Sequence, residues 1–265
     1  TPQDPALYTL SLRVESDGRV NDEISVPVGL AVYSASTLGS RGFISLNNQP
    51  VFLKAVDYVE EYPDEGSTLS CTQIERDVQL LRTLGVNAIH TLFIAPHPYL
   101  AYLCAKNGIM IIADFPVYDI PAELLTADEL RARMMNTADR MIAAYERNPA
   151  VAVWNIASGL EQHDVATAEF LRTMSTAMRR LSVKPISQLV RFRSRAVASD
   201  NVDAVIYMLD RFDESQESIT RELTRLAGIG NKPFLLCYGK PVQPDNRNGY
   251  ADPISTEAQA RYILT

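Results

Sequence analysis

The sequence predicts an α/β protein with two regions, a β-hairpin in residues 1–38 and a (β/α)8 TIM barrel in residues 39–265. Short apolar runs alternate with helical segments throughout the second region, which is typical of a parallel sheet covered by helices. No glycine-rich phosphate fingerprint follows any of these runs, so a barrel is favoured over an open doubly wound sheet. The first region instead shows the alternation of antiparallel strands.

Two alternating runs with turn residues between them indicate the hairpin. Leu10, Leu12 and Val14 alternate with polar neighbours, residues 16–19 supply turn chemistry, and the alternation resumes over residues 24–28. An isolated hairpin is marginally stable in water. We therefore expect it to pack against the rest of this chain or against a β-domain that precedes it.

Seven apolar runs in the second region are predicted to be strands. They cover residues 51–56, 86–93, 109–113, 150–157, 185–190, 202–209 and 233–237. The run at 109–113 is apolar without interruption, as expected for a strand covered on both faces. The eighth strand of the barrel is absent from this chain. The barrel is therefore either completed by sequence not present here or left open at one seam.

Six of these strands are followed by a helical pattern. The first helix opens at a capping-box spacing over residues 72–75 and places Ile74, Val78 and Leu81 on one face. The other helices are predicted at residues 98–107, 126–148, 165–181, 214–227 and 255–264. The stretch 191–195 is too irregular to assign.

The composition excludes several classes of protein and partner. Of 265 residues, 46% are hydrophobic and 22% are charged, which is the balance of a globular chain with a core. A net charge of −7, with 25 thinly spread basic residues, argues against nucleic acid as a partner. No apolar run approaches the roughly 18 residues of a membrane span. The N-terminus has no initiator Met and no leader pattern, so we expect a processed product or an excised piece.

Cysteine and histidine spacing predicts no bound metal, and no cofactor is expected. The three cysteines are odd in number and widely spaced, which fits neither a disulfide framework nor a metal site and leaves the compartment undecided. A metal site of His90 or His97 with Asp57 or Asp114 is the alternative for the histidines. Because the three histidines of the chain show no ligand spacing, structural roles are favoured.

Six segments of the second region occur in the order and spacing of a known family. They are residues 42–58, 75–81, 84–89, 96–99, 114–118 and 147–154. These segments resemble the barrel domain of glycoside hydrolase family 2, the family of β-galactosidases, β-glucuronidases and β-mannosidases. Residues 4–10 resemble the end of the immunoglobulin-like sandwich that precedes that barrel. The resemblance covers most of the chain and implies carbohydrate and other domains or subunits as partners.

The resemblance also locates the two positions at which the family carries its catalytic glutamates. A retaining glycosidase needs two carboxylates about 5 to 5.5 Å apart, one as acid/base and one as nucleophile. Gly159 stands at the acid/base position, and Tyr238 stands at or beside the nucleophile position. The resemblance therefore implies a barrel that has lost its hydrolytic pair. Glu161 as an acid/base and Tyr238 as a nucleophile are the remaining catalytic candidates.

The candidates for contact with a sugar lie at predicted strand ends, where barrels of this class carry their chemistry. They are Asp57, Tyr58, Asp114, Trp154 and Asn155. For Trp154, the only tryptophan, two interpretations stay open: stacking on a sugar ring or packing in the core. At other positions of this end, polar sugar-binding groups of the family are replaced by apolar residues, namely Val59, Leu92, Phe93 and Ala113.

Three functions are compatible with these observations. The first hypothesis is a barrel without hydrolytic activity that binds carbohydrate or serves as a structural module of a larger protein. The second is an active retaining β-glycosidase of the β-galactosidase or β-glucuronidase type. Its carboxylates would come from unexpected positions, such as Glu161 and Asp245, or from sequence not present here. The third is a protein-interaction scaffold whose altered barrel end faces another subunit.

Overall fold

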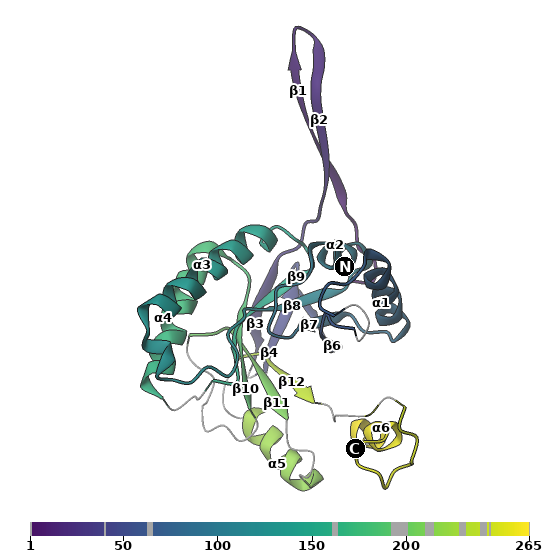
Figure 1. Ribbon diagram of the computed structural model, residues 1–265, viewed down its shortest axis with the longest axis vertical. Helices are drawn as coiled ribbons and strands as arrows, with labels where there is room; N and C mark the ends of the chain where they lie inside the picture. The colour runs from purple at the N-terminus through teal and green to yellow at the C-terminus, as the bar shows by residue number, and fades with distance from the viewer. Residues whose placement is uncertain are drawn as a thin grey trace.

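The computed structural model describes residues 2–39, 41–62, 66–160, 164–191, 201–209, 215–227, 232–238, 243 and 245–264. Its largest sheet has seven parallel strands in the order β12-β11-β10-β9-β8-β7-β6 (Figure 1). They are β6 (Ala55–Tyr58), β7 (Ala88–Thr91), β8 (Met110–Asp114), β9 (Val151–Ser158), β10 (Ile186–Arg191), β11 (Ala204–Leu209) and β12 (Phe234–Tyr238). The edge strands approach each other, since Cys237 Sγ lies 3.3 Å from Asp57 Oδ2. The sheet is therefore an incomplete barrel, as the seven predicted strands require.

Helices connect most of these strands and cover the outside of the sheet, whereas the last helix of the chain lies apart from the sheet (Figure 1). They are α1 (Cys71–Thr83), α2 (Pro98–Asn107), α3 (Asp128–Tyr145), α4 (Val165–Leu181), α5 (Gln216–Ala227) and α6 (Thr256–Leu264), with a short 3-10 turn η1 (Leu124–Thr126) before α3. All six predicted helices are confirmed, with shifts of a few residues at their ends. The predicted apolar face of α1, Ile74, Val78 and Leu81, is buried. None of the described helices is both long enough and apolar enough to cross a membrane.

The first predicted strand, at residues 51–56, is wrong in its position. β5 (Gln49–Val51) ends where that prediction begins, and β6 starts only at Ala55. Asn87 fixes the connection between them, because its side chain accepts a hydrogen bond from the Lys54 amide and donates one to the Phe52 carbonyl, each 2.8 Å long. The apolar run is therefore divided between two sheets.

A small antiparallel sheet, which the sequence pattern does not predict, contains β3 (Tyr33–Leu38), β4 (Arg41–Leu46) and β5. Its buried side chains join those of the inner barrel face, so that Ile44 and Leu46 share one apolar cluster with Met110 and Ile112 of β8. β3 lies before the predicted boundary at residue 38 and pairs with β4, which lies after it. The division of the chain at that residue stays a prediction.

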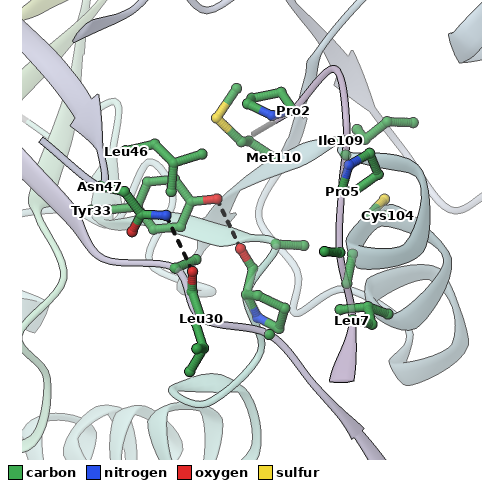
Figure 2. Close-up of a pocket in the computed structure, with 17 residues that line it drawn as sticks. Pro2, Pro5, Leu7, Leu30, Tyr33, Leu46, Asn47, Cys104, Ile109 and Met110 are labelled. Atoms are coloured by element: carbon green, nitrogen blue, oxygen red, sulfur yellow. Dashed lines mark hydrogen bonds between the residues drawn. The ribbon is translucent and has the colours of Figure 1, made fainter. Parts of the chain in front are cut away.

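This antiparallel sheet closes the amino end of the barrel, the end at which the parallel strands begin. Tyr33 Oη donates a 2.8 Å hydrogen bond to the carbonyl of Pro149, just before β9. Figure 2 shows this bond beside a cavity of about 70 Å³ that the N-terminal segment helps to line. Gly108 ends α2 in the left-handed conformation at φ 69°, as its place after the helix predicts. A Cβ there would overlap the Pro2 carbonyl, so only glycine allows this approach.

β1 (Tyr8–Ser16) and β2 (Arg19–Val28) form the predicted hairpin. Their register runs from Tyr8 opposite Val28 to Ser16 opposite Arg19, with a bulge between Val14 and Glu15. The hairpin extends away from the barrel (Figure 1), and every residue of β1 is exposed. The apolar side chains of β1 are therefore uncovered among the described residues.

Candidate functional site

A cluster of polar side chains fills the inside of the barrel at the carboxyl end, the end at which the parallel strands finish. His90 of β7 lies at its centre. Its Nδ1 is 2.9 Å from Asp57 Oδ1 on β6, and its Nε2 is 2.7 Å from Asp114 Oδ1 on β8. His90 and Asp114 are buried, whereas 39% of the Asp57 side chain is exposed. Three neighbouring strands are thus joined through one imidazole ring.

The two carboxylates keep the His90 ring charged. Burial alone would lower the pKa of His90, but hydrogen bonds with Asp114 and Asp57 outweigh burial and raise the pKa to about 9. Only the doubly protonated ring can donate from both nitrogens, as this geometry requires. At neutral pH the centre of the cluster is therefore one positive charge between two acidic side chains.

The hydrogen bonds of Asp114 extend the cluster to two further strands. Its Oδ1 accepts a 2.7 Å bond from Asn155 Nδ2, and its Oδ2 accepts a 3.0 Å bond from the Phe93 amide. Ser158 Oγ lies 3.4 Å from Oδ2, and Ser187 Oγ of β10 donates a 3.2 Å bond to Asn155 Oδ1. Asp114 is fully buried and bonded at both oxygens, so it is poorly placed to meet a substrate.

Cys237 brings β12 to the same cluster. Its thiol donates a 3.3 Å hydrogen bond to Asp57 Oδ2. Burial, with the nearby Asp57 carboxylate, raises the pKa of Cys237 well above its ordinary value, so the thiol stays neutral. We refer to Asp57, His90, Asp114, Asn155, Ser158, Ser187 and Cys237 as the polar cluster.

Two of the sequence-predicted sugar contacts lie outside this cluster. Tyr58 is buried and donates a 2.6 Å hydrogen bond to Asp77 Oδ2 on α1. Burial and this bond raise the pKa of Tyr58 far above its usual range. Trp154 is fully buried, with its Nε1 3.1 Å from Ser182 Oγ and its ring centroid 5.4 Å from that of Phe115. Both side chains lie between the sheet and its helices.

The described residues contain no group of three His, Cys, Asp or Glu side chains suited to a metal ion. In its charged form His90 has no lone pair available, because both ring nitrogens then carry a proton and face a carboxylate. His97 lies on the surface, where its Nδ1 accepts a 3.1 Å bond from the Tyr99 amide and caps α2.

A cavity of about 790 Å³ lies at the seam between β6 and β12. Its lining is mostly apolar, and Asp57, His90 and Cys237 of the polar cluster reach it. This is the place at which an eighth strand would close a barrel of this kind.

Comparison with known sequences identifies the barrel. The sequence model described as "Glycosyl hydrolases family 2, TIM barrel domain" matches residues 40–263. The chain belongs to glycoside hydrolase family 2. Among curated relatives, a β-galactosidase of Psychromonas ingrahamii is 24% identical over 181 residues, which cover 64% of this chain and 17% of the relative. The β-glucuronidase of Mus musculus is 22% identical over 185 residues, which cover 68% of this chain and 28% of the relative.

Solved structures share the fold of this family 2 chain. The β-glucuronidase of Bifidobacterium dentium complexed with coumarin-3-O-glucuronide superposes with a TM-score of 0.89 at 19% identity, covering 99% of this chain and 45% of that one. The GH2 β-galacturonidase of Eisenbergiella tayi bound to galacturonate gives a TM-score of 0.86 at 17% identity, covering 99% and 48%. The chain thus spans less than half of these proteins.

Gly159, which the resemblance assigns to the acid/base position, lies beside two charged side chains. Gly159 follows β9 in the left-handed conformation, at φ 70°. A Cβ built on it would lie 3.4 Å from Arg191 Nη2 and 3.5 Å from Asp119 Oδ1. Arg191 and Asp119 are themselves joined by a 3.1 Å ion pair. The space beside Gly159 therefore holds a guanidinium and a carboxylate that neutralise each other.

The two remaining catalytic candidates are not described at the side-chain level. Glu161 lies outside the described residues of this family 2 barrel. Tyr238 ends β12 opposite Leu209 of β11, but its side chain also lies outside the described residues. The loss of the catalytic glutamates stays a prediction from the family pattern.

The sequence reasoning missed an aromatic pair at the same end of the barrel. Phe93 follows β7, Tyr118 follows β8, and their rings stack with centroids 3.8 Å apart and planes 28° apart. The sequence marked Phe93 only as a lost polar group, and Tyr118 only as part of a segment shared with the family. No spacing along the chain connects them, because the pair depends on loops from neighbouring strands.

Proposed function

We propose that this family 2 barrel binds carbohydrate without hydrolysing glycosidic bonds, as a module of a larger protein. The observation that carries the proposal is the Arg191–Asp119 ion pair beside Gly159. A general acid needs a carboxyl group that delivers its proton to the glycosidic oxygen. Among the described residues, the nearest carboxylate to Gly159 is that of Asp119, and it is already paired with the Arg191 guanidinium.

Two further carboxylates at the carboxyl end, those of Asp57 and Asp114, are engaged as well. Asp57 and Asp114 share the charged ring of His90. Asp114 is fully buried, whereas a nucleophile must reach the anomeric carbon of a bound sugar. Asp57 is partly exposed but holds two partners, His90 and Cys237. Among the described residues, these contacts support a barrel end that offers binding groups and no hydrolytic pair.

The role as a module is supported by the hairpin and by the length of the chain. Tyr8, Leu10 and Leu12 of β1 and Ile24 of β2 are large apolar residues, each at least 45% exposed. Exposed apolar side chains gathered on one element are typical of an interaction surface. The solved relatives are more than twice as long as this chain. We expect the hairpin to contact a β-sandwich domain of the complete protein.

An active retaining β-glycosidase is the rival function, and the names of the relatives favour it. Curated relatives of this chain are called β-galactosidase or β-glucuronidase. In that case Glu161, Asp245 or other residues of the complete protein would supply the carboxylates. Release of nitrophenol from nitrophenyl β-galactoside or β-glucuronide, above the level of a mock purification, would establish this rival.

Thermal stabilisation by glycans tests the proposed function. A ligand that binds only the folded state raises the melting temperature. We expect at least one β-linked sugar of a broad panel to raise it, with no hydrolysis of the same sugar in a parallel incubation. Hydrolysis would support the glycosidase. A complete absence of shifts would contradict carbohydrate binding and favour the protein-interaction scaffold.

A further inference from the structure

We infer that the exposed ring of Tyr118, together with the Asp119–Arg191 ion pair, is the carbohydrate contact of this barrel and takes an uncharged pyranose ring. The inference rests on the proposed function and goes beyond it by naming the binding residues and the class of sugar. We refer to Phe93, Tyr118, Asp119 and Arg191 as the aromatic platform. Gly159 adjoins it.

The platform presents a rigid aromatic surface to solvent. One face of Tyr118 is covered by Phe93, with centroids 3.8 Å apart, yet 45% of the residue remains exposed. An aromatic face is electron-rich, and the C–H bonds on one face of a pyranose carry slight positive charge, so the two stack favourably. A ring already supported by a second ring loses little freedom on binding.

Backbone hydrogen bonds hold the platform to the strand ends. Tyr118 forms a β-bridge with Ser158 at the end of β9. The Ser158 amide donates to the Val117 carbonyl at 2.9 Å, and the Asp119 amide donates to the Ser158 carbonyl at 3.0 Å. Phe93 is held from below by the 3.0 Å bond from its amide to Asp114. The polar cluster therefore supports the platform through Asp114. The groups that solvent can reach, namely Tyr118, Asp119 and Arg191, belong to the platform itself.

Backbone strain is concentrated at this place. Phe93 has a φ of 63°, in the left-handed region that bulky residues avoid, and the neighbouring Asp119, a residue type that tolerates this region, has a φ of 50°. The other described non-glycine residues with positive φ are Asp17, Asn47 and Asn48, which occupy hairpin turns and are residue types that tolerate this conformation. A phenylalanine held in such a conformation is costly, and such residues collect at binding and catalytic sites.

The ion pair gives the platform the groups that sugar hydroxyls require. Each hydroxyl both donates and accepts hydrogen bonds, while Arg191 offers only donors and Asp119 only acceptors. About half of each side chain is exposed, 46% for Arg191 and 53% for Asp119. Their charges cancel, so the site does not favour an acidic sugar over a neutral one. Gly159 has no side chain that would displace the pair.

The test is a titration of the whole chain with each of two sugar probes. Changes in NMR chemical shifts report binding and give the dissociation constant. The probes are methyl β-D-galactopyranoside, which is neutral, and methyl β-D-glucuronide, which is acidic. Tyr118→Ala removes the ring, and we expect it to weaken binding of the neutral probe about tenfold. Tyr118→Phe keeps the ring and serves as the matched control, with an affinity within about twofold of wild type. Arg191→Met should also weaken binding.

Each outcome of this titration has a defined meaning. Wild-type binding that Tyr118→Ala leaves unchanged, with its melting temperature also unchanged, overturns the aromatic platform but not the proposed function. A wild type that binds neither probe nor any sugar of the thermal panel overturns both. A tenfold preference for the acidic probe overturns the assignment of a neutral sugar. If Tyr118→Ala does not fold, Arg191→Met takes its place as the test variant, and Tyr118→Phe stays the control. Unchanged binding of the neutral probe by Arg191→Met then overturns the aromatic platform.

Discussion

The two ends of the barrel use different chemistry to hold the same seven strands. At the amino end, apolar side chains of β3 and β4 fill the interior, and close backbone contacts such as Gly108 against Pro2 fix the chain. At the carboxyl end the interior is filled by the polar cluster, whose hydrogen bonds link β6, β7, β8, β9, β10 and β12. The amino end is stabilised by close packing, and the carboxyl end is stabilised by hydrogen bonds around a charged imidazole. Substitutions and pH should therefore affect the two ends differently.

Loss of the charge at the centre of the polar cluster should have the largest effect. His90→Leu leaves the buried Asp114 carboxylate without its cation, which costs about 3 to 5 kcal/mol when one partner of a buried pair is removed. Urea-induced unfolding measures the change in the free energy of unfolding. His97→Ala is the matched control: it removes a surface histidine that caps α2 and should cost only about 1 kcal/mol. Equal losses in the two variants would contradict the role of charge.

Alkaline pH should weaken the carboxyl end without any substitution. The pKa of His90 is about 9 in the folded protein and about 6.5 in the unfolded chain. The stabilisation from its charge is thus complete below pH 6.5 and is lost as pH rises through 9, by roughly 3 kcal/mol in all. Burial lowers the pKa of Lys184 to about 8 in the folded protein. Above pH 8 the titration of Lys184 therefore raises the free energy of unfolding with increasing pH, opposite to the effect of His90.

The decisive window for this prediction is therefore pH 6.5 to 8. The free energy of unfolding, measured by urea titration at each pH, should fall steadily in this window. The fall should be absent from His90→Leu, which lacks the imidazole whose pKa differs between the folded and unfolded chain. A profile that is flat in the wild type, or equally steep in both proteins, would show that His90 is not held in its charged form.

The amino end should respond to shape. Gly108→Ala combines left-handed strain with an overlap against the Pro2 carbonyl, and we expect a loss of about 2 to 3 kcal/mol. Gly85→Ala is the matched control, because Gly85 has the same φ of 69° and no atom within 4 Å of its missing Cβ. It should cost only about 1 kcal/mol. Thermal unfolding of both variants measures the difference. Identical melting temperatures would show that the close contact between Gly108 and Pro2 contributes nothing to stability.

The same contrast explains what the sequence could predict. Continuous apolar runs such as that of β8 are visible in the sequence because both faces of a parallel strand are covered. β3, β4 and β5 were not separated from the barrel, because the apolar run after residue 50 continues across the end of β5 and only the Asn87 hydrogen bonds divide it. Fold class follows from periodicity, but this division follows from one distant side chain.

The candidate site shows a similar limit. Asp57, Asp114 and Asn155 converge as their places at strand ends suggest, but Tyr58 and Trp154 are each adjacent to one of them in the chain. Successive strand residues point to opposite faces, so Tyr58 and Trp154 had to face the helices. Strand alternation alone was enough to exclude them from the interior.

The links between strands were beyond what the sequence could supply. His90 joins Asp57 to Asp114 only because β6, β7 and β8 pair in a register that places all three side chains together. The stack of Phe93 on Tyr118 likewise needs the geometry of two loops. Register and loop geometry arise from contacts distant along the chain, which periodicity does not encode.

The smallest expected effect concerns hydrolysis at the carboxyl end. Gly159→Glu places a carboxylate at the position that the resemblance assigns to the acid/base, yet it should produce no measurable turnover of nitrophenyl β-galactoside or β-glucuronide, because a retaining mechanism also needs a nucleophile. The new side chain should instead pair with Arg191, and the left-handed φ of 70° should cost about 1 kcal/mol. Gly159→Gln carries the same strain without the carboxylate. Hydrolysis by Gly159→Glu that Gly159→Gln lacks would reveal a surviving nucleophile and turn the carboxyl end from a binding surface into an active site.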